Sequence, residues 1–375
     1  DRNGYWRGLG LEYDNSAYNQ GINTFSTLSY IHIANGGNPT WGNSALEVRD
    51  RYGDVSISHV LVTGTNTDAL GVSYMKGQSN DSVNVHVHHF KAPGPVQTGA
   101  EFRQNDYLNL HVSDLQIHNA FYEGMRIEYN DYSVMQFKNL DIKDGEEEAM
   151  RLYSNGSATQ VKVELSNFVN NNQRYYYDGI VRIGNYDYTN GGVTLNNNNF
   201  IVGDDYAWAN YSNFYHVRVD ASGSGDQIDM TSNYWGPAVT AEMDSLGSRA
   251  NISKIYDYQD QTSLSEVDYS NWLSSPMIRP VKVHVEDTYG VLGDTVMLAV
   301  DIVVPLDTSI ISAELSLTGF QDHLSFVSLE TAQGLAGAAG WSVATNAADT
   351  TLFIAAAGAN PVSGRGALFW LKLAV

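Results

Sequence analysis

The chain has 375 residues, 43% of them hydrophobic and only 17% charged, so it is long enough for two folded domains with surfaces built mostly from uncharged polar side chains. Its 42 acidic residues outnumber 21 basic ones, and the formal net charge of −21 argues against nucleic acid as a partner, because phosphate binding needs a basic surface. Cysteine is absent, which excludes disulfides, zinc–thiolate sites and a cysteine nucleophile.

A short unit with strand-like alternation recurs along the first part of the chain. Each copy places a small or apolar residue, an outward charge, a large apolar residue and another polar residue in succession, which is the period-2 pattern of a half-buried strand. Recurrence every few tens of residues is typical of a solenoid, in which each copy is one rung stacked on the last. The copies lie at residues 45–49, 99–103, 124–128, 149–153, 181–183 and 217–219.

A second recurring element, a polar residue followed by an apolar one, advances in step with the first. The two tracks keep pace with each other, while the number of residues between them varies. This pattern predicts a parallel β-helix whose turns carry the insertions. Stacked Asn side chains can hydrogen-bond along such a column, much as in cross-β ladders. The predicted ladder consists of Asn139, Asn167, Asn199 and Asn233. The track lies at residues 30–31, 59–60, 89–90, 114–115, 139–140, 167–168, 199–200 and 233–234.

The two ends of the repeat region carry distinctive motifs. Tyr-Trp-Arg-Gly-Leu at residues 5–9 precedes Leu-Ser-Tyr-Ile-His-Ile at residues 28–33, and Ser-Asn-Tyr-Trp-Gly-Pro at residues 232–237 precedes Val-Asp-Tyr-Ser-Asn-Trp-Leu-Ser-Ser-Pro at residues 267–276. These motifs resemble those of secreted right-handed parallel β-helix repeat proteins, a group that contains lyases, hydrolases and adhesins and so implies a fold rather than one function. Trp235 and Trp272 are expected to cover the last rung, whose edge would otherwise be open to pairing.

Two prolines, Pro276 and Pro280, end the repeats, and the composition then changes. Short alternating segments with turn signals follow, which predict a β-sandwich. They lie at residues 281–285, 293–302, 311–317, 324–327, 352–357 and 366–373. We therefore predict an all-β chain with a right-handed parallel β-helix at residues 1–279 and a β-sandwich at residues 280–375.

The order of motifs in the second domain is G-D-T-V, I-S-A-x-L-x-L, L-x-F-V, I-A-A-A and G-x-G-A-L-x-x-L-x-L. This order resembles a cohesin-type module, shortened by several strands' worth of loops. The resemblance implies an assembly or attachment role. The face with which cohesins grip a dockerin does not transfer residue by residue to this shorter chain.

The outward charges of the first track form two predicted columns. In the first column, Glu47 and Glu101 of the early rungs are followed by arginines in the later rungs. In the neighbouring column, Arg49 and Arg103 are followed by Glu128. This order predicts Glu101 beside Arg126 and Arg103 beside Glu128, each one rung apart, as favourable cross-strand pairs. The arginines of the first column are Arg126, Arg151, Arg182 and Arg218.

Acids just before three of these strands, Glu123, Glu148 and Asp178, are expected to relieve the repulsion between stacked arginines. Two interpretations follow. The column is either a surface ion-pair network, or an arginine-lined stripe that binds a carboxylated or sulfated polysaccharide or a neighbouring subunit.

Neither a catalytic set nor a metal site is predicted. Carboxylates at residues 146–148 and 204–205 would lie at glycosidase distances by accident in any acidic β-helix. Arg182 beside Asp178, or His216 beside Arg218, could serve as the base of a lyase. His86 and His88 share one strand face, but no third ligand stands at metal spacing. Asp and Asn side chains in turns could hold Ca²⁺, although no D-x-D-x-D-G loop occurs, so no cofactor is expected.

Aromatic residues gather in the two longest rung insertions. Exposed aromatic patches usually mark interaction surfaces, and these side chains could stack on sugar rings or dock another subunit. The candidates are Tyr175, Tyr176, Tyr177, Tyr206 and Trp208.

The sequence thus leads to the expectation of an extracellular, non-enzymatic surface or fibre-forming structural or adhesive protein. Its expected partners are other copies of itself, other surface proteins and polysaccharide. No segment has the run of about 20 apolar residues that spans a membrane, and no leader opens the chain, so we interpret it as a trimmed piece of a longer precursor. The alternatives are a polysaccharide lyase or glycoside hydrolase acting on an acidic glycan, and a carbohydrate-binding module.

Overall fold

The computed structural model describes most of the chain and divides it into two compact units, residues 1–277 and 278–375, each with its own hydrophobic core. No helix among the described residues is long and apolar enough to cross a membrane. The described residues are 9–12, 25–36, 44–50, 53–156, 158–173, 179–185, 192–203, 214–220, 227–277, 281–285, 291–304, 309–318, 324–348 and 351–375.

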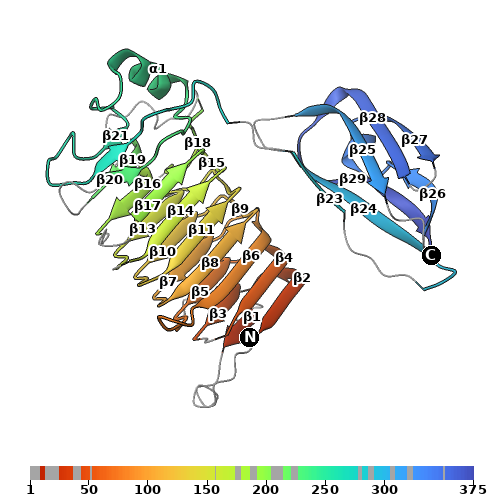
Figure 1. The fold of residues 1–375 in the computed structure, drawn as a ribbon, viewed down its shortest axis with the longest axis horizontal. Helices are drawn as coiled ribbons and strands as arrows, with labels where there is room; N and C mark the ends of the chain where they lie inside the picture. The colour runs from red at the N-terminus through yellow and green to blue at the C-terminus, as the bar shows by residue number, and fades with distance from the viewer. Residues whose placement is uncertain are drawn as a thin grey trace. The chain divides into compact units, whose positions relative to one another are not determined.

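The first unit is a parallel β-helix whose rungs stack in chain order (Figure 1). Its first sheet, called sheet 1, confirms the first repeat track, because each described copy pairs in the expected register; for example, Glu101 is the partner of Arg126. Its strands are β1 (Leu9–Glu12), β3 (Leu46–Arg49), β5 (Leu70–Ser73), β7 (Ala100–Arg103), β10 (Met125–Glu128), β13 (Met150–Tyr153), β16 (Gly179–Gly184), β19 (Tyr215–Val219) and β21 (Ile255–Tyr256).

The second sheet, called sheet 2, begins as long strands and then continues as two arms. The long strands are β2 (Ser26–Ala34), β4 (Val55–Thr63) and β6 (Val83–Ala92), and β6 pairs with both arms. Arm A consists of β8 (Leu108–Ser113), β11 (Val134–Lys138), β14 (Gln160–Glu164), β17 (Gly192–Asn196), β20 (Gln227–Asp229) and β22 (Glu266–Asp268). Arm B consists of β9 (Gln116–His118), β12 (Asp141–Lys143), β15 (Asn167–Val169) and β18 (Asn199–Ile201).

Inward-facing side chains of equivalent positions form apolar columns through the β-helix. In sheet 1 one column runs Val48, Val72, Phe102, Ile127, Leu152, Ile183 and Val219, all at most 1% exposed. Burying one such side chain contributes about 1.5–3 kcal/mol. The alternation that revealed the repeats in the sequence is therefore the alternation between this core and the solvent face.

The corner between the two arms is formed by residues with left-handed backbone conformation. Each occupies the same place in its rung, and φ lies between 52° and 58°. This conformation costs most residues about 1–2 kcal/mol, and Asn, Asp and His tolerate it better than most. The corner residues are Tyr30, His59, His89, Asp114 and Asn139. The first five copies of the second sequence track, from Tyr30 to Asn139, thus begin at corners.

A buried asparagine ladder supports the corner that follows sheet 1. Asn105, Asn130 and Asn155 are at most 1% exposed and lie one rung apart. The Nδ2 group of Asn130 donates to Asn155 Oδ1 at 2.9 Å and to the Phe102 carbonyl at 3.0 Å, and Asn105 Nδ2 donates to Asn130 Oδ1 at 2.9 Å. The amides therefore satisfy one another and the backbone inside the coil, as buried polar groups require.

The C-terminal end of the β-helix is covered by a helix and aromatic side chains. Helix α1 (Pro237–Leu246) buries Val239 and Met243 against the core. Trp235 is fully buried and stacks on Phe200 with ring centroids 4.8 Å apart. Trp272 packs partly buried beside this core and donates its Nε1–H to Asp244 Oδ1 at 2.9 Å.

The second unit consists of two antiparallel sheets that share one core, which confirms the β-sandwich. One sheet contains β23 (Lys282–Val285), β24 (Thr295–Val304), β29 (Gly364–Ala374) and β26 (Ser325–Glu330), and the other contains β25 (Ile310–Thr318), β28 (Thr351–Val362) and β27 (Ser342–Ala348). The short helix α2 (Leu335–Ala338) packs beside them. Val300 and Leu371 from the first sheet and Leu352 and Ile354 from the second belong to one cluster. Strand β27 was not anticipated from the sequence, because its residues carry few large apolar side chains.

Replacing Asn130 by Ala should lower the free energy of unfolding by roughly 1–3 kcal/mol, because it leaves the Phe102 carbonyl and the Asn105 amide without these buried partners. Urea denaturation followed by circular dichroism measures the change. The matched control is Asn109→Ala, because Asn109 donates to Asn84 on the outer surface at 3.3 Å. An equal effect of the two substitutions would contradict a special role for the buried ladder.

Candidate functional site

The outward face of sheet 1 carries the predicted arginine column. Arg126, Arg151, Arg182 and Arg218 are register partners on β10, β13, β16 and β19. At the lower end of this column the sign changes, and Arg126 Nη1 lies 3.3 Å from Glu101 Oε1. The rung-by-rung order of charges in the sequence therefore corresponds to the order of side chains on the surface.

Buried carboxylates lie between these arginines. Glu123, whose side chain is fully buried, lies 2.6 Å from Arg126 Nη2 and 3.2 Å from Arg151 Nη1. Burial alone would raise the pKa of Glu123, but the Arg126 and Arg151 guanidiniums outweigh it and hold this pKa below its usual value. Glu123 is therefore ionised and pairs with arginines of two neighbouring rungs.

The upper arginines are neutralised in the same way. Glu148 Oε1 lies 3.5 Å from Arg182 Nη1, and Asp220 contacts both Arg182 and Arg218, the latter at 2.6 Å. Asp178, the third predicted acid, lies outside the described residues. Among the described residues, the four guanidiniums contact five carboxylates: Glu101, Glu123, Glu128, Glu148 and Asp220.

This arrangement favours the ion-pair interpretation of the column over the ligand stripe. The arginine side chains are only 24–28% exposed, and each already contacts at least one carboxylate. An acidic polysaccharide would have to displace these carboxylates from the arginines and would be repelled by their negative charge. Binding of a ligand or a subunit to this face remains a prediction from the sequence.

One predicted pair is arranged differently from expectation. Arg103 and Glu128 are register partners, but Glu128 Oε1 lies 3.5 Å from Arg151 Nε, whereas Arg103 lies 4.0 Å from Glu101 and over the ring of Tyr129. Glu128 is buried, and this burial is the main reason why its pKa is raised. The carboxylate thus pairs with the arginine of the next rung rather than with its register partner.

The predicted Asn139–Asn167–Asn199–Asn233 ladder is wrong as a single column. Asn199 Nδ2 does donate to Asn167 Oδ1 at 2.8 Å. However, Asp141 is the partner of Asn167, and Asn139 stacks on Asp114 instead. Asn233 lies level with Asn198, from whose backbone N–H it accepts a hydrogen bond at 2.8 Å.

The error has a simple origin in the sequence. At this corner the polar–apolar pair occurs twice in succession, as Asn139-Leu140 and as Asp141-Ile142. An alignment of rungs that is shifted by two residues therefore fits the polar–apolar pattern equally well. Only the backbone pairing distinguishes the corner column from the first column of arm B.

The predicted aromatic contacts cannot be placed. Tyr175, Tyr176, Tyr177, Tyr206 and Trp208 all lie outside the described residues, and their role remains a prediction. Other tyrosines do form a platform: the rings of Tyr107 and Tyr132 stack one rung apart with centroids 4.9 Å apart. Because Tyr132 is 49% exposed, this stacked pair is accessible to solvent.

Among the described residues, Glu123, Glu148 and His216 have structural roles rather than the surroundings of a catalytic group. Glu123, Glu147 and Glu148 each bring one carboxylate oxygen within 4.8 Å of the others, but Glu123 and Glu148 are buried and ion-paired with the arginines. His216, considered above as the base of a lyase, is buried in the core, and this burial lowers its pKa to about 3. His216 is therefore a neutral core residue at physiological pH.

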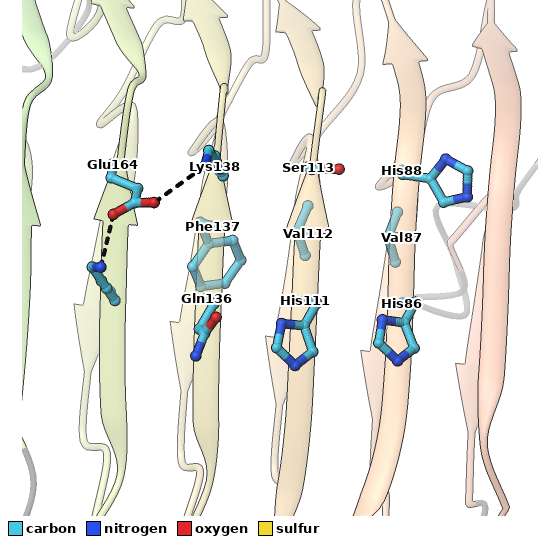
Figure 2. Close-up of a pocket in the computed structure, with 11 residues that line it drawn as sticks. His86, Val87, His88, His111, Val112, Ser113, Gln136, Phe137, Lys138 and Glu164 are labelled. Atoms are coloured by element: carbon cyan, nitrogen blue, oxygen red, sulfur yellow. Dashed lines mark ion pairs between the residues drawn. The ribbon is translucent and has the colours of Figure 1, made fainter.

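A groove that the sequence did not reveal crosses the outward face of sheet 2 (Figure 2). It spans β6, β8, β11 and β14 and has a volume of about 340 Å³. Strand alternation places its polar side chains in two columns, and every second residue between them points inward. The first column is His86, His111, Gln136 and Lys162, and the second is His88, Ser113, Lys138 and Glu164.

The groove combines flat rings with hydrogen-bonding groups. The imidazoles of His86 and His111 stack with centroids 5.1 Å apart and an angle of 7°. Burial, with a smaller effect of His86, lowers the pKa of His111 below its usual value. Glu164 accepts a hydrogen bond from Lys162 and lies 2.7 Å from its Nζ and 3.6 Å from Lys138 Nζ. These contacts, first of all the one to Lys162, lower the pKa of Glu164.

A second hollow of about 310 Å³ continues the groove along arm A. It reaches from β11 across β14 to β17 and shares Gln136 and Lys162 with the first. Strands lie about 4.8 Å apart, so five strands from β6 to β17 cover roughly 19 Å by that spacing. Outward polar residues recur at equivalent positions of successive rungs, and this periodic spacing is the sequence signal that could have predicted the two hollows.

No protein-family model matches the chain, and no curated protein shows significant sequence similarity to it. Among solved structures, the chain is similar to the tailspike protein of Acinetobacter baumannii phage AM24, with 9% sequence identity and a TM-score of 0.33. The match covers 98% of this chain and 75% of the tailspike. A TM-score this low does not establish a shared fold, and nothing is transferred from the tailspike to this chain.

Replacing Glu123 by Gln should lower the free energy of unfolding at pH 7 by roughly 2–4 kcal/mol, somewhat less than for fully buried ion pairs because the arginines remain partly exposed. Because the pKa of Glu123 is lowered in the folded state, its stabilisation is present above the unfolded value of 4.5 and is lost as the pH falls through the folded value. The difference in free energy of unfolding between wild type and variant should therefore become smaller at acidic pH. Urea titrations at several pH values measure it.

The control for this substitution is Glu164→Gln, because Glu164 pairs with two lysines that are about half exposed. Its effect should stay below about 1 kcal/mol. A Glu123→Gln effect that is equally small, or that does not depend on pH, would contradict the role of the buried carboxylate.

Proposed function

We propose that the protein is an extracellular, non-enzymatic surface protein whose β-helix binds an uncharged polysaccharide along the groove of sheet 2. The observation that carries this proposal is the pair of outward polar columns that crosses β6, β8, β11 and β14 in register. Equivalent side chains on successive rungs offer a linear ligand a repeated set of contacts.

The chemistry of the groove suits a sugar chain. His, Gln, Ser, Lys and Glu side chains supply both donors and acceptors for hydroxyl groups. The parallel His86 and His111 rings lie side by side on this face, whereas Val87, Val112 and Phe137 between the polar columns point into the core. The surface that a ligand would meet is therefore mainly polar, which suits the hydroxyl groups of a sugar chain.

The charges of the groove and of the whole chain favour an uncharged ligand over an acidic one. Lys138 and Lys162 both lie within 4 Å of Glu164, so the groove carries little excess positive charge near them. The whole chain has a formal net charge of −21 and would repel a polyanion at long range. This differs from the acidic glycan that we considered for the arginine column.

The carboxylates of the groove support binding rather than hydrolysis. Glycosidases use two carboxyl groups about 5–9.5 Å apart. Glu164 is the one carboxylate among the residues that line the groove, and its lowered pKa makes it a poor general acid. A lyase or hydrolase would have to use other residues.

The second unit fits an attachment module. It is a β-sandwich with its own core, and its motifs resemble those of cohesin-type modules, so we propose that it joins the β-helix to another surface protein or to a second copy. The ion-paired column of sheet 1 supports the view that the β-helix is a rigid spacer.

A glycan array followed by isothermal titration calorimetry tests the proposal. Gln136→Ala and His111→Ala should each weaken binding about tenfold, which corresponds to 1.4 kcal/mol, because both side chains line the groove. The matched control is Gln116→Ala on β9 of arm B, which should bind normally. Absence of binding to any neutral glycan, or the release of reducing or unsaturated sugars with time, would contradict the proposal.

A further inference from the structure

Three histidines from two rungs converge at the corner between the arms of sheet 2. His59 and His89 occupy the same corner position, with φ of 52° and 54°, and their rings stack with centroids 4.7 Å apart. His88 precedes His89, and its ring lies edge-on to both at 5.2–5.7 Å. One ring nitrogen of each histidine lies within 4.8 Å of one nitrogen of the other two.

The left-handed corner explains why consecutive residues meet here. In a regular strand His88 and His89 would point to opposite faces. The turn at His89 instead brings both imidazoles to the same side, with Nδ1 of His88 and Nδ1 of His89 only 3.0 Å apart. His59 then joins them from the neighbouring rung, because corner residues stack in register.

The distances are close to those of a metal site. With zinc–nitrogen bonds of about 2.0–2.1 Å in tetrahedral geometry, neighbouring ligand nitrogens lie roughly 3.4 Å apart. The two Nδ1 atoms lie 3.0 Å apart as a hydrogen-bonded pair, about 0.4 Å closer than this spacing. The third nitrogen, within 4.8 Å, needs a shift of roughly 1.5 Å, and the stacked His59 ring must also turn so that its nitrogen lone pair points at the metal.

A carboxylate is positioned to orient one of the ligands. Asp114 occupies the corner of the next rung, is only 8% exposed, and accepts a hydrogen bond from Asn139 Nδ2. Its Oδ2 lies 3.8 Å from Nε2 of His89, an ion-pair contact about 0.5 Å or more longer than a hydrogen bond, so a small approach would complete the bond. Metal-binding histidines commonly donate their other ring N–H to a carboxylate, and an N–H at Nε2 would leave Nδ1 of His89 available to the metal.

We propose that His59, His88 and His89 bind one divalent transition metal of the zinc class, with Asp114 orienting His89. Three imidazoles suit zinc, nickel or copper, whereas calcium and magnesium prefer oxygen ligands. A water molecule would take the fourth position. The sequence showed His88 beside His86 but not the third ligand, because His59 lies a full rung earlier in the chain.

The site is separate from the neighbouring histidine pair of the groove. The His88 ring extends away from His86 and His111, toward the side of β6 that pairs with β4 (Figure 2). The His86 and His111 rings lie nearly parallel at 5.1 Å, and no third imidazole joins them among the described residues. This pair therefore provides an internal control for nonspecific binding to histidine.

Isothermal titration calorimetry of the full chain with zinc chloride, and separately with nickel chloride, tests the proposal. We expect one metal per chain, and at least tenfold weaker binding in His59→Ala and in His89→Ala. The control variant His111→Ala, at the other histidine pair, should bind the metal normally. Neither His59 nor His89 lines the groove, so loss of metal binding and loss of glycan binding can be told apart.

Two measurements on the wild-type chain keep the test decisive if a variant does not fold. Cobalt(II) should give the intense visible absorption of a tetrahedral site, and zinc should shift the imidazole nitrogen resonances of His59, His88 and His89 in NMR spectra. Absence of zinc and nickel binding would overturn the proposal. So would binding that survives His59→Ala and His89→Ala but is lost in His111→Ala.

Discussion

The structure depends on one constraint, the in-register stacking of rungs at the spacing of paired strands. Parallel pairing places equivalent residues of successive rungs directly above one another, so every side chain has a neighbour of its own column above and below. Apolar columns then close the core, from Val48 to Val219 in sheet 1. Polar columns must satisfy themselves, and the Asn105–Asn130–Asn155 ladder does so with side-chain amides that bond both along the column and to the backbone.

The same constraint governs charge. Four arginines in one column would repel each other. Among the described residues, Glu123 and Glu148 from the turns before β10 and β13, and acids of the neighbouring column, lie between them. The result is a surface in which charge is neutralised locally although the chain carries a large net negative charge. Sheet 1 therefore presents a face of paired charges, whereas the outward face of sheet 2 carries the groove for which we propose ligand binding.

The corner between the arms connects architecture to chemistry. A left-handed residue is needed there in every rung, and side chains of successive rungs meet at this corner at short distances. Where the corner residues are Asp and Asn, they hydrogen-bond to each other; where they are histidines, they form a cluster of imidazoles beside the groove. Both proposed binding functions thus arise from stacking the same position in successive rungs.

The sequence by itself determined the solenoid, the division into two domains of different strand pattern, and the register of sheet 1, including Glu101 beside Arg126. It could do so because burial on one face imposes a strict period of two on each strand. It failed where a two-residue shift preserves the pattern, as with Asn139 and Asn167, and where contacts join corners of different rungs, as with His59 and His89. Those contacts depend on backbone turns and on side-chain directions, which no local pattern records and only the folded coil decides.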